Sequence, residues 1–171
     1  MLVSIYADFI GMTFGSTNQA ETVLEAMGVM RRKALLGLDE AVVVACDPKG
    51  QISLRSEFDP THAEESAARS LLMLLVQAIA EAAPGDQALR PGVIARAQAL
   101  ATCGLDTVLV KSVRARLTPG SSAIFFLIPK ESLANANAVE TILRLFDGQL
   151  HRTTLSEQSA VGLSQMVNMV L

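Results

Sequence analysis

Hydrophobic residues follow two different periods along this chain, and the changes between them predict the order of its secondary structure. Residues 2–8 and 41–46 are short apolar runs, which are typical of buried β-strands. Residues 51–56 alternate polar and apolar side chains, which predicts a strand with one face exposed to water. A turn-forming stretch, 47–50, separates the last two runs and contains Asp, Pro and Gly. These two strands are therefore predicted to form a β-hairpin.

Helical spacing begins after the first strand. A loop carrying Gly11 and Gly15 comes first, and Ser16 or Thr17 can then cap a helix that ends at Gly37. The predicted core face of this helix consists of Val23, Leu24, Met27, Met30, Ala34 and Leu35.

The second half of the chain contains a similar succession. Residues 118–121 predict a tight turn, 122–128 a buried strand, and 131–146 a helix. Residues 149–155 predict a last strand, and Ser156 caps a terminal helix. The inward side of the helix before the last strand consists of Val139, Ile142, Leu143 and Phe146.

Residues 61–117 are predicted to be helical throughout. Within them, 71–80 is apolar nearly all round and is broken only by Gln77. A later helix spans about 106–117, and its predicted apolar face consists of Val108, Leu109, Val113 and Leu117. The order of elements is thus βαββ, a helical insertion over 61–117, and βαβα. This order predicts one α+β domain over residues 1–171, a ferredoxin-like sandwich with a helical insertion.

Composition narrows the classes of partner. Half of the residues are hydrophobic and 18% are charged, whereas soluble domains average about 25% charged residues. We expect this apolar excess to be covered by a second subunit or by a membrane. The net charge is −3 and the basic residues are scattered, which excludes nucleic acid as the main partner. The N-terminus has no pattern of a secretory signal, so we expect a cytoplasmic protein, with the periphery of the inner membrane as the alternative.

Three blocks carry a resemblance to a known family: Leu38-Asp39-Glu40-Ala41-Val42-Val43-Val44 followed by Asp47, Lys49 and Gly50; Leu117-Thr118-Pro119-Gly120-Ser121-Ser122-Ala123; and Gly148-Gln149-Leu150-His151-Arg152-Thr153-Thr154-Leu155-Ser156. In order and spacing they resemble a bacterial domain-of-unknown-function family often labelled "predicted membrane protein". The resemblance covers most of the chain and supplies no catalytic residues. Members of the family typically carry a long apolar hairpin in the middle. The counterpart here, 67–83, is interrupted by charge and is shorter than the roughly 20 residues that a spanning helix needs.

The apolar helix over 71–80 is the feature most in need of a partner. Its candidate interface residues are Leu71, Leu72, Leu74, Leu75 and Ile79. A core helix of this domain, a dimer interface and a membrane-resting surface all account for it. The membrane alternative is the least favoured, because interfacial helices usually carry a polar face rich in Lys and Arg.

Residues with catalytic or ligand-binding chemistry are few and widely spaced. His62 and His151 have no Cys, Asp or Glu at metal-ligand spacing, and Cys46 and Cys103 form no metal or redox motif. No nucleophile elbow, P-loop or dinucleotide fingerprint is present. We therefore predict no catalytic, cofactor or metal site, and no enzyme.

Gly15, Ser16 and Thr17 form a candidate anion loop, because the free N–H groups of a helix N-terminus can bind an anion. The alternative is a flexible loop capped by Ser16. Taken together, the sequence predicts a bacterial, non-enzymatic, homo-oligomeric interaction or regulatory module of unknown ligand. A membrane-associated protein using the central helices and a small-molecule or anion-binding domain are the alternatives.

Overall fold

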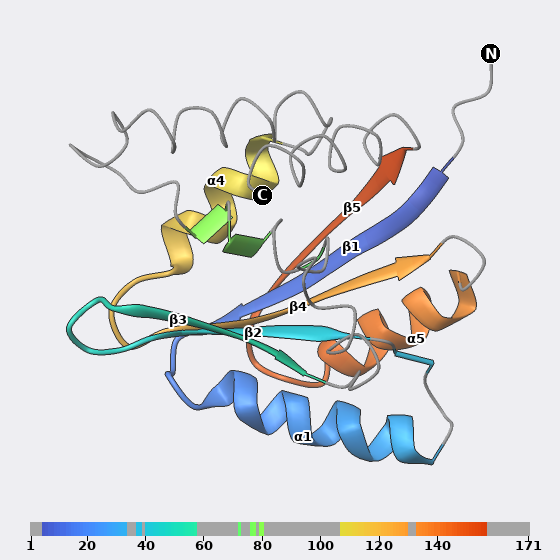
Figure 1. The fold of residues 1–171 in the computed structure, drawn as a ribbon, viewed down its shortest axis with the longest axis horizontal. Helices are drawn as coiled ribbons and strands as arrows, with labels where there is room; N and C mark the ends of the chain where they lie inside the picture. The colour runs from blue at the N-terminus through green and yellow to red at the C-terminus, as the bar shows by residue number, and fades with distance from the viewer. Residues whose placement is uncertain are drawn as a thin grey trace, which may run out of the picture.

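A computed structural model describes residues 5–33, 37–38, 40–57, 72, 76–77, 79–80, 107–129 and 133–156. Within these residues the chain is an α+β protein with a five-stranded antiparallel sheet and three helices (Figure 1). The elements are β1 (Ile5–Phe14), α1 (Gln19–Arg32), β2 (Ala41–Cys46), β3 (Ile52–Glu57), α4 (Thr107–Arg116), β4 (Ser122–Pro129), α5 (Leu133–Leu143) and β5 (Gln149–Ser156).

The strands lie in the order β3-β2-β4-β1-β5, and every neighbouring pair is antiparallel. Strands β1 and β2 are therefore parallel to one another with β4 between them, and α1 connects them. In the same way β4 and β5 are parallel with β1 between them, and α5 connects them. Helices α1 and α5 cover one face of the sheet and α4 lies over the other (Figure 1).

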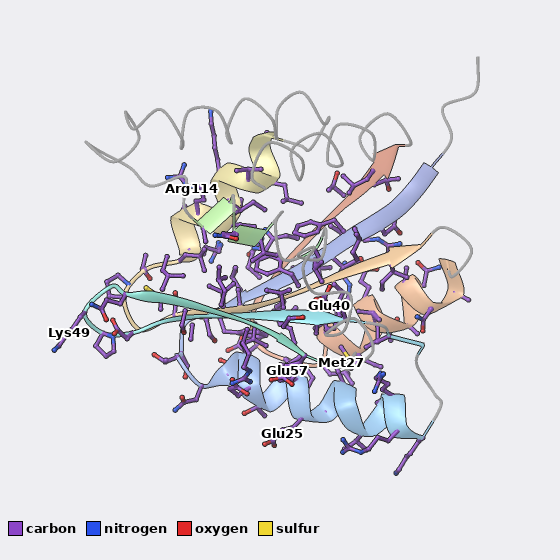
Figure 2. The ribbon with its side chains drawn as sticks, viewed as in Figure 1. Glu25, Met27, Glu40, Lys49, Glu57 and Arg114 are labelled. Atoms are coloured by element: carbon purple, nitrogen blue, oxygen red, sulfur yellow. The ribbon has the colours of Figure 1, made fainter. Side chains whose placement is uncertain are left out.

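The core on the α1/α5 face is built from every second residue of the strands, because successive side chains of a strand point to opposite faces. Met27 of α1 lies on the sheet side of its helix, whereas Glu25 points away from the sheet (Figure 2). The strand residues in this core include Ile10, Met12, Phe14, Val43, Ile124, Phe126 and Ile128, and the helix residues include Val23, Leu24, Ala136, Val139 and Leu143.

The core on the α4 face uses the alternate strand positions. Leu109 and Val113 of α4 pack there together with three helical residues of the central region, Leu72, Val76 and Ile79. The sheet residues beneath them are Phe9, Val42, Val44, Ala123, Phe125 and Leu155. The rings of Phe9 and Phe125 stack with centroids 5.5 Å apart. Both faces of the sheet therefore have a packed core.

The first strand is longer than the sequence predicted, which corrects the loop expected at Gly11. Strand β1 continues to Phe14, and Gly11 is paired with Phe125 of β4. A Cβ atom on Gly11 would lie 2.4 Å from the Phe125 ring. Glycine is thus required because an aromatic ring crosses the strand at this point, so it does not mark a loop.

Two predicted faces also need correction. On α4, Leu109 and Val113 are buried as predicted, but Val108 is 71% exposed, because it points away from the sheet. Strand β3 was predicted to have one wet face, yet it is exposed on both faces, and only Leu54 and Glu57 are half-buried. No described helix covers β3, since α1 and α4 sit over the strands further in (Figure 1).

Several local predictions are confirmed. The hairpin of β2 and β3 closes through a bond from the Gly50 N–H to the Asp47 carbonyl at 2.9 Å, with Gly50 at φ 87°. The turn before β4 has a bond from the Ser121 N–H to the Thr118 carbonyl at 3.0 Å. Gly120 takes φ 85° there, the conformation that glycine adopts without strain.

Other predictions fall outside the described residues. These include the terminal helix after Ser156, the core-face positions Ala34 and Leu35, and most of the insertion over 61–117. The predicted end of the first helix at Gly37 is corrected, because α1 ends at Arg32 with Lys33 as its C-cap. The assignment of residues 1–171 to a single domain stays a prediction.

Candidate functional site

Strands β3 and β5 are the two outer strands of the sheet, and β3 is the candidate interaction edge. Among the described strands it pairs only with β2, so its other side faces no strand (Figure 1). The register places Val44 opposite Leu54, and Lys49 projects from the connecting turn into solvent (Figure 2). The hairpin fixes which groups of β3 face outward.

Two backbone hydrogen bonds show which way the N–H and C=O groups of β2 and β3 point. The Asp47 N–H donates to the Gln51 carbonyl at 2.9 Å, and the Cys46 N–H donates to the Ser121 carbonyl at 2.9 Å. Even-numbered residues of β2 therefore bond to β4 and odd-numbered residues bond to β3. Because bonding alternates along an antiparallel ladder, Ile52, Leu54 and Ser56 point their N–H and C=O groups toward the free edge.

The side chains of β3 form two different surfaces. On the α4 side Ile52 is 40% exposed and Leu54 packs at the margin of the core. On the α1 side the Arg55 guanidinium donates to both oxygens of Glu21, at 2.5 and 2.7 Å, and lies 2.5 Å from Glu57. The hydrogen bond to Glu21 is the main reason that the pKa of Arg55 is raised above its ordinary value. The positive charge of Arg55 is therefore shared between two carboxylates, Glu21 of α1 and Glu57 of β3.

This edge lacks several of the features that usually prevent strands from pairing with other chains, although it carries the charged residues Arg55 and Glu57. Its sequence, Ile-Ser-Leu-Arg-Ser-Glu, contains neither Lys nor Pro, and its pairing with β2 has no bulge. A regular strand with free backbone groups and exposed apolar side chains is a template for another strand.

His151 lies in β5 and is buried against Thr13 of β1. The Thr13 Oγ1 and His151 Nε2 atoms are 3.1 Å apart, and either can donate according to the tautomer. Burial, and then the positive charge of Arg116, lowers the pKa of His151 to about 4. The ring is therefore neutral at pH 7, and its contact with Thr13 joins β1 to β5.

Asp8 and Arg152 form a charged cluster on the other face of the same two strands. Their side chains are in contact, and Thr154 donates to Asp8 at 3.0 Å. Arg152 also donates to Asn137 of α5 at 3.2 Å and lies 3.6 Å from Glu140. These contacts tie α5 to the sheet and account for the charges of both Asp8 and Arg152.

Cys46 is buried in β2, and Cys103 lies outside the described residues. Burial raises the pKa of the Cys46 thiol, and the nearby Asp47 carboxylate raises it further. The thiol is therefore protonated and a poor nucleophile. The Cys46 N–H donates to the carbonyl of Ser121, the residue just before β4, and the hydroxyl of Ser121 has no partner within the described part of the chain.

The candidate anion loop is hydrogen-bonded to Ser122 at the start of β4. Asn18, rather than Ser16 or Thr17, is the N-cap of α1. The Ala20 N–H donates to the hydroxyl of Ser122 at 3.1 Å, and that hydroxyl donates to the Ser16 carbonyl at 2.6 Å. Gly15 and Ser16 are exposed and Thr17 is half-buried. The neutral Ser122 hydroxyl thus accepts a hydrogen bond from an N–H group that an anion would need. Glu21 adds a negative charge in the first turn of the helix, which disfavours a bound anion.

The candidate interface on the central apolar helix is corrected in part. Leu72 is 2% exposed and Ile79 is 1% exposed, and both pack in the core of this chain. They are therefore not available to a partner, and the core-helix alternative applies to them. Leu71, Leu74 and Leu75 lie outside the described residues, as does His62.

A shallow depression of about 400 Å³ lies where α5 meets the ends of β1 and β5. Its lining residues are Met12, Arg144, Phe146, Gly148, Gln149 and Leu150. Arg144 is mostly exposed and sits 3.7 Å from Glu140. The polar side chains that line it, Arg144 and Gln149, are both exposed.

No protein-family model, curated protein or solved structure matches this chain. The resemblance to the bacterial family therefore stays a prediction. Among the residues that the structure describes, no helix is long and apolar enough to cross a membrane.

Sequence reasoning recognised β3 as a strand but missed its place at the edge. The signal was present, because Ser53, Arg55 and Ser56 make this strand far more polar than 41–46. Asp8 and Arg152 were also missed, because 144 positions separate them and neither has a local motif.

Proposed function

We propose that this protein is a non-enzymatic interaction module that works as a homo-oligomer. The observation that carries the proposal is the open edge of β3, where Ile52 is 40% exposed and the backbone groups of alternate residues face outward. A partner strand would cover these groups and the apolar side chains together. A second copy always accompanies the first, so self-association is the simplest way to cover this edge.

The placement of the chemically active residues supports a non-enzymatic role. His151 is neutral and paired with Thr13, Asp8 is paired with Arg152, and Cys46 is a buried thiol. Each of these side chains has a structural task. The Ser122 hydroxyl at the start of α1 weighs against the anion-binding alternative.

We also propose that the underlying fold is ferredoxin-like, with β3 added at one edge. The support is the arrangement of the other four strands, β2-β4-β1-β5, with crossovers through α1 and α5 that interleave. Solution of the experimental structure tests this assignment, and a different order of these four strands would refute it.

The molar mass in solution tests the proposed function. One chain has a mass of 18.2 kDa. Light scattering coupled to size exclusion, run over a hundredfold range of loading concentration, should give twice this mass at the upper end. A mass of one chain at every concentration would contradict the proposal.

A further inference from the structure

We infer that two copies of this chain join along β3, antiparallel and in one register, with Leu54 of one copy facing Leu54 of the other. The two five-stranded sheets then form one continuous sheet. This inference rests on the proposed function, and it adds the surface and the register of the self-association.

Symmetry limits the registers that are possible. A two-fold axis perpendicular to a sheet keeps each face of the sheet on the same side in both copies. Since side chains alternate between faces, odd residues can then oppose only odd residues, and even residues only even ones. Each allowed register therefore has one residue of β3 on the axis, opposite itself.

The length of β3 leaves two registers that pair most of the strand. The strand covers Ile52–Glu57. An axis at Leu54 pairs residues 52–56 of both copies, and an axis at Arg55 pairs residues 53–57. An axis at any other residue of the strand leaves more of it unpaired.

Electrostatics decides between these two registers. With Arg55 on the axis, two guanidinium groups oppose each other in a position that makes no ladder hydrogen bond, where Cα atoms are about 4.5 Å apart. Like charges directly opposite each other destabilise a sheet. With Leu54 on the axis, Leu54 meets the partner's Leu54, Ile52 meets the partner's Ser56, and Arg55 meets the partner's Ser53. No like charges are directly opposed in this register.

The same register satisfies the backbone. Ile52, Leu54 and Ser56 carry the outward N–H and C=O groups. Leu54 bonds with the partner's Leu54, and Ile52 bonds with the partner's Ser56, so these groups are all paired. Ile52 and Leu54 also lie on the same side of the sheet, where the partner's leucine covers apolar surface that is now exposed or half-exposed.

A second copy suits this edge better than an unrelated acidic segment. Arg55 is already held by Glu21 and Glu57, so β3 offers no unpaired positive charge for an acidic partner to recognise. Pairing around a two-fold axis also closes the assembly, because each copy uses the same edge and that edge is then covered.

Three single-cysteine variants read the register directly: Leu54→Cys, Arg55→Cys and Ser56→Cys. Directly opposed residues of a hydrogen-bonded pair have Cα atoms about 5.5 Å apart, within the range that a disulfide spans. After mild oxidation, the Leu54→Cys chain should give a covalent dimer on a non-reducing gel. The other two variants should cross-link no more than the parent chain, which carries the same natural cysteines.

The other outcomes of this experiment are separable. Cross-linking of Arg55→Cys or Ser56→Cys in place of Leu54→Cys would overturn the register. A parent chain of twice the monomer mass with no cross-link at any of the three positions would overturn β3 as the surface, while leaving self-association in place. A monomeric parent would overturn both this inference and the proposed function.

A pair of lysine substitutions tests the surface without cysteine chemistry. Ile52 is 40% exposed on β3, and Val29 is 39% exposed on α1, so neither substitution disturbs the core. Ile52→Lys should weaken dimerisation at least tenfold in sedimentation experiments, and Val29→Lys should leave it unchanged, with both variants folded by circular dichroism. Equal effects, or no effect of Ile52→Lys on a dimeric protein, would overturn the inference.

Discussion

At the scale of single residues, the centre of the sheet depends on close contacts between side chains far apart in the sequence. The Phe125 ring lies over Gly11 and stacks on Phe9, and the His151 ring is buried against Thr13. Both contacts lie on the α4 face of the sheet. Gly11 and His151 therefore serve the packing of the sheet, and substitution of either residue should change the stability of the fold.

Gly11→Ala should destabilise the fold by about 1–3 kcal/mol, because the new methyl group would lie 2.4 Å from the Phe125 ring and force it to move. Urea denaturation followed by circular dichroism measures the change. Gly15→Ala is the matched control, since nothing lies within 4 Å of the added atom, and its stability should change by less than about 0.5 kcal/mol. Equal effects of the two substitutions would contradict the close packing at Gly11.

The stability of the protein should fall as the pH falls from 6.5 to 4 because of His151. The folded state holds the pKa of His151 at about 4, below the ordinary value of 6.5, so the unfolded chain binds the proton first. The stability contributed by the neutral ring is complete above pH 6.5 and is lost progressively toward pH 4, by about 3 kcal/mol.

His151→Gln removes this titration and is the appropriate comparison. The free energy of unfolding of the unchanged protein should fall by about 3 kcal/mol more than that of the variant between pH 7 and pH 4. Parallel pH profiles for the two proteins would show that His151 is not held neutral by burial.

At the scale of elements, two adjacent serines at the start of β4 have opposite roles. The Ser122 hydroxyl links the first turn of α1 to the loop before it, through Ala20 and Ser16. The hydroxyl of Ser121 is buried without a partner among the described residues. A first-turn N–H of helix α1 is therefore bonded by a strand residue distant in the sequence, because the N-cap Asn18 makes no side-chain capping bond.

Ser122→Ala should cost about 1–3 kcal/mol, since it leaves a buried N–H and a carbonyl without their partner. Ser121→Ala is the matched control, because it removes a buried hydroxyl that makes no bond and should be neutral or slightly stabilising. Thermal denaturation of the two variants measures the loss of stability that each substitution causes. A larger loss for Ser121→Ala would mean that the capping role is wrongly assigned.

The elements that could be predicted from sequence are those with local signals. The hairpin of β2 and β3 has turn residues between two strand patterns, and Pro119 and Gly120 mark the turn before β4. Gly11 was taken for a loop because its neighbour Phe125 is far away in the sequence. The edge position of β3 was also missed, although the polar residues Ser53, Arg55 and Ser56 of the strand indicate it.

At the scale of the whole molecule, the described helical residues cover the sheet on both faces but do not cover β3. Helices α1 and α5 on one side, and α4 with Leu72, Val76 and Ile79 on the other, bury the strands from β2 inward (Figure 1). Among the described residues, β3 extends beyond this cover, Arg55 is held by Glu21 and Glu57, and the outer backbone groups of the strand have no partner strand. The central claim is that a second copy covers this edge.

Hydrogen exchange at single amides of β3 tests that claim most directly. The N–H groups of Ser53, Arg55 and Glu57 bond to β2, whereas those of Ile52, Leu54 and Ser56 face outward. At high protein concentration all six should exchange slowly by NMR, and on dilution only the outward three should become fast. Fast exchange of Ile52, Leu54 and Ser56 at every concentration would contradict the account.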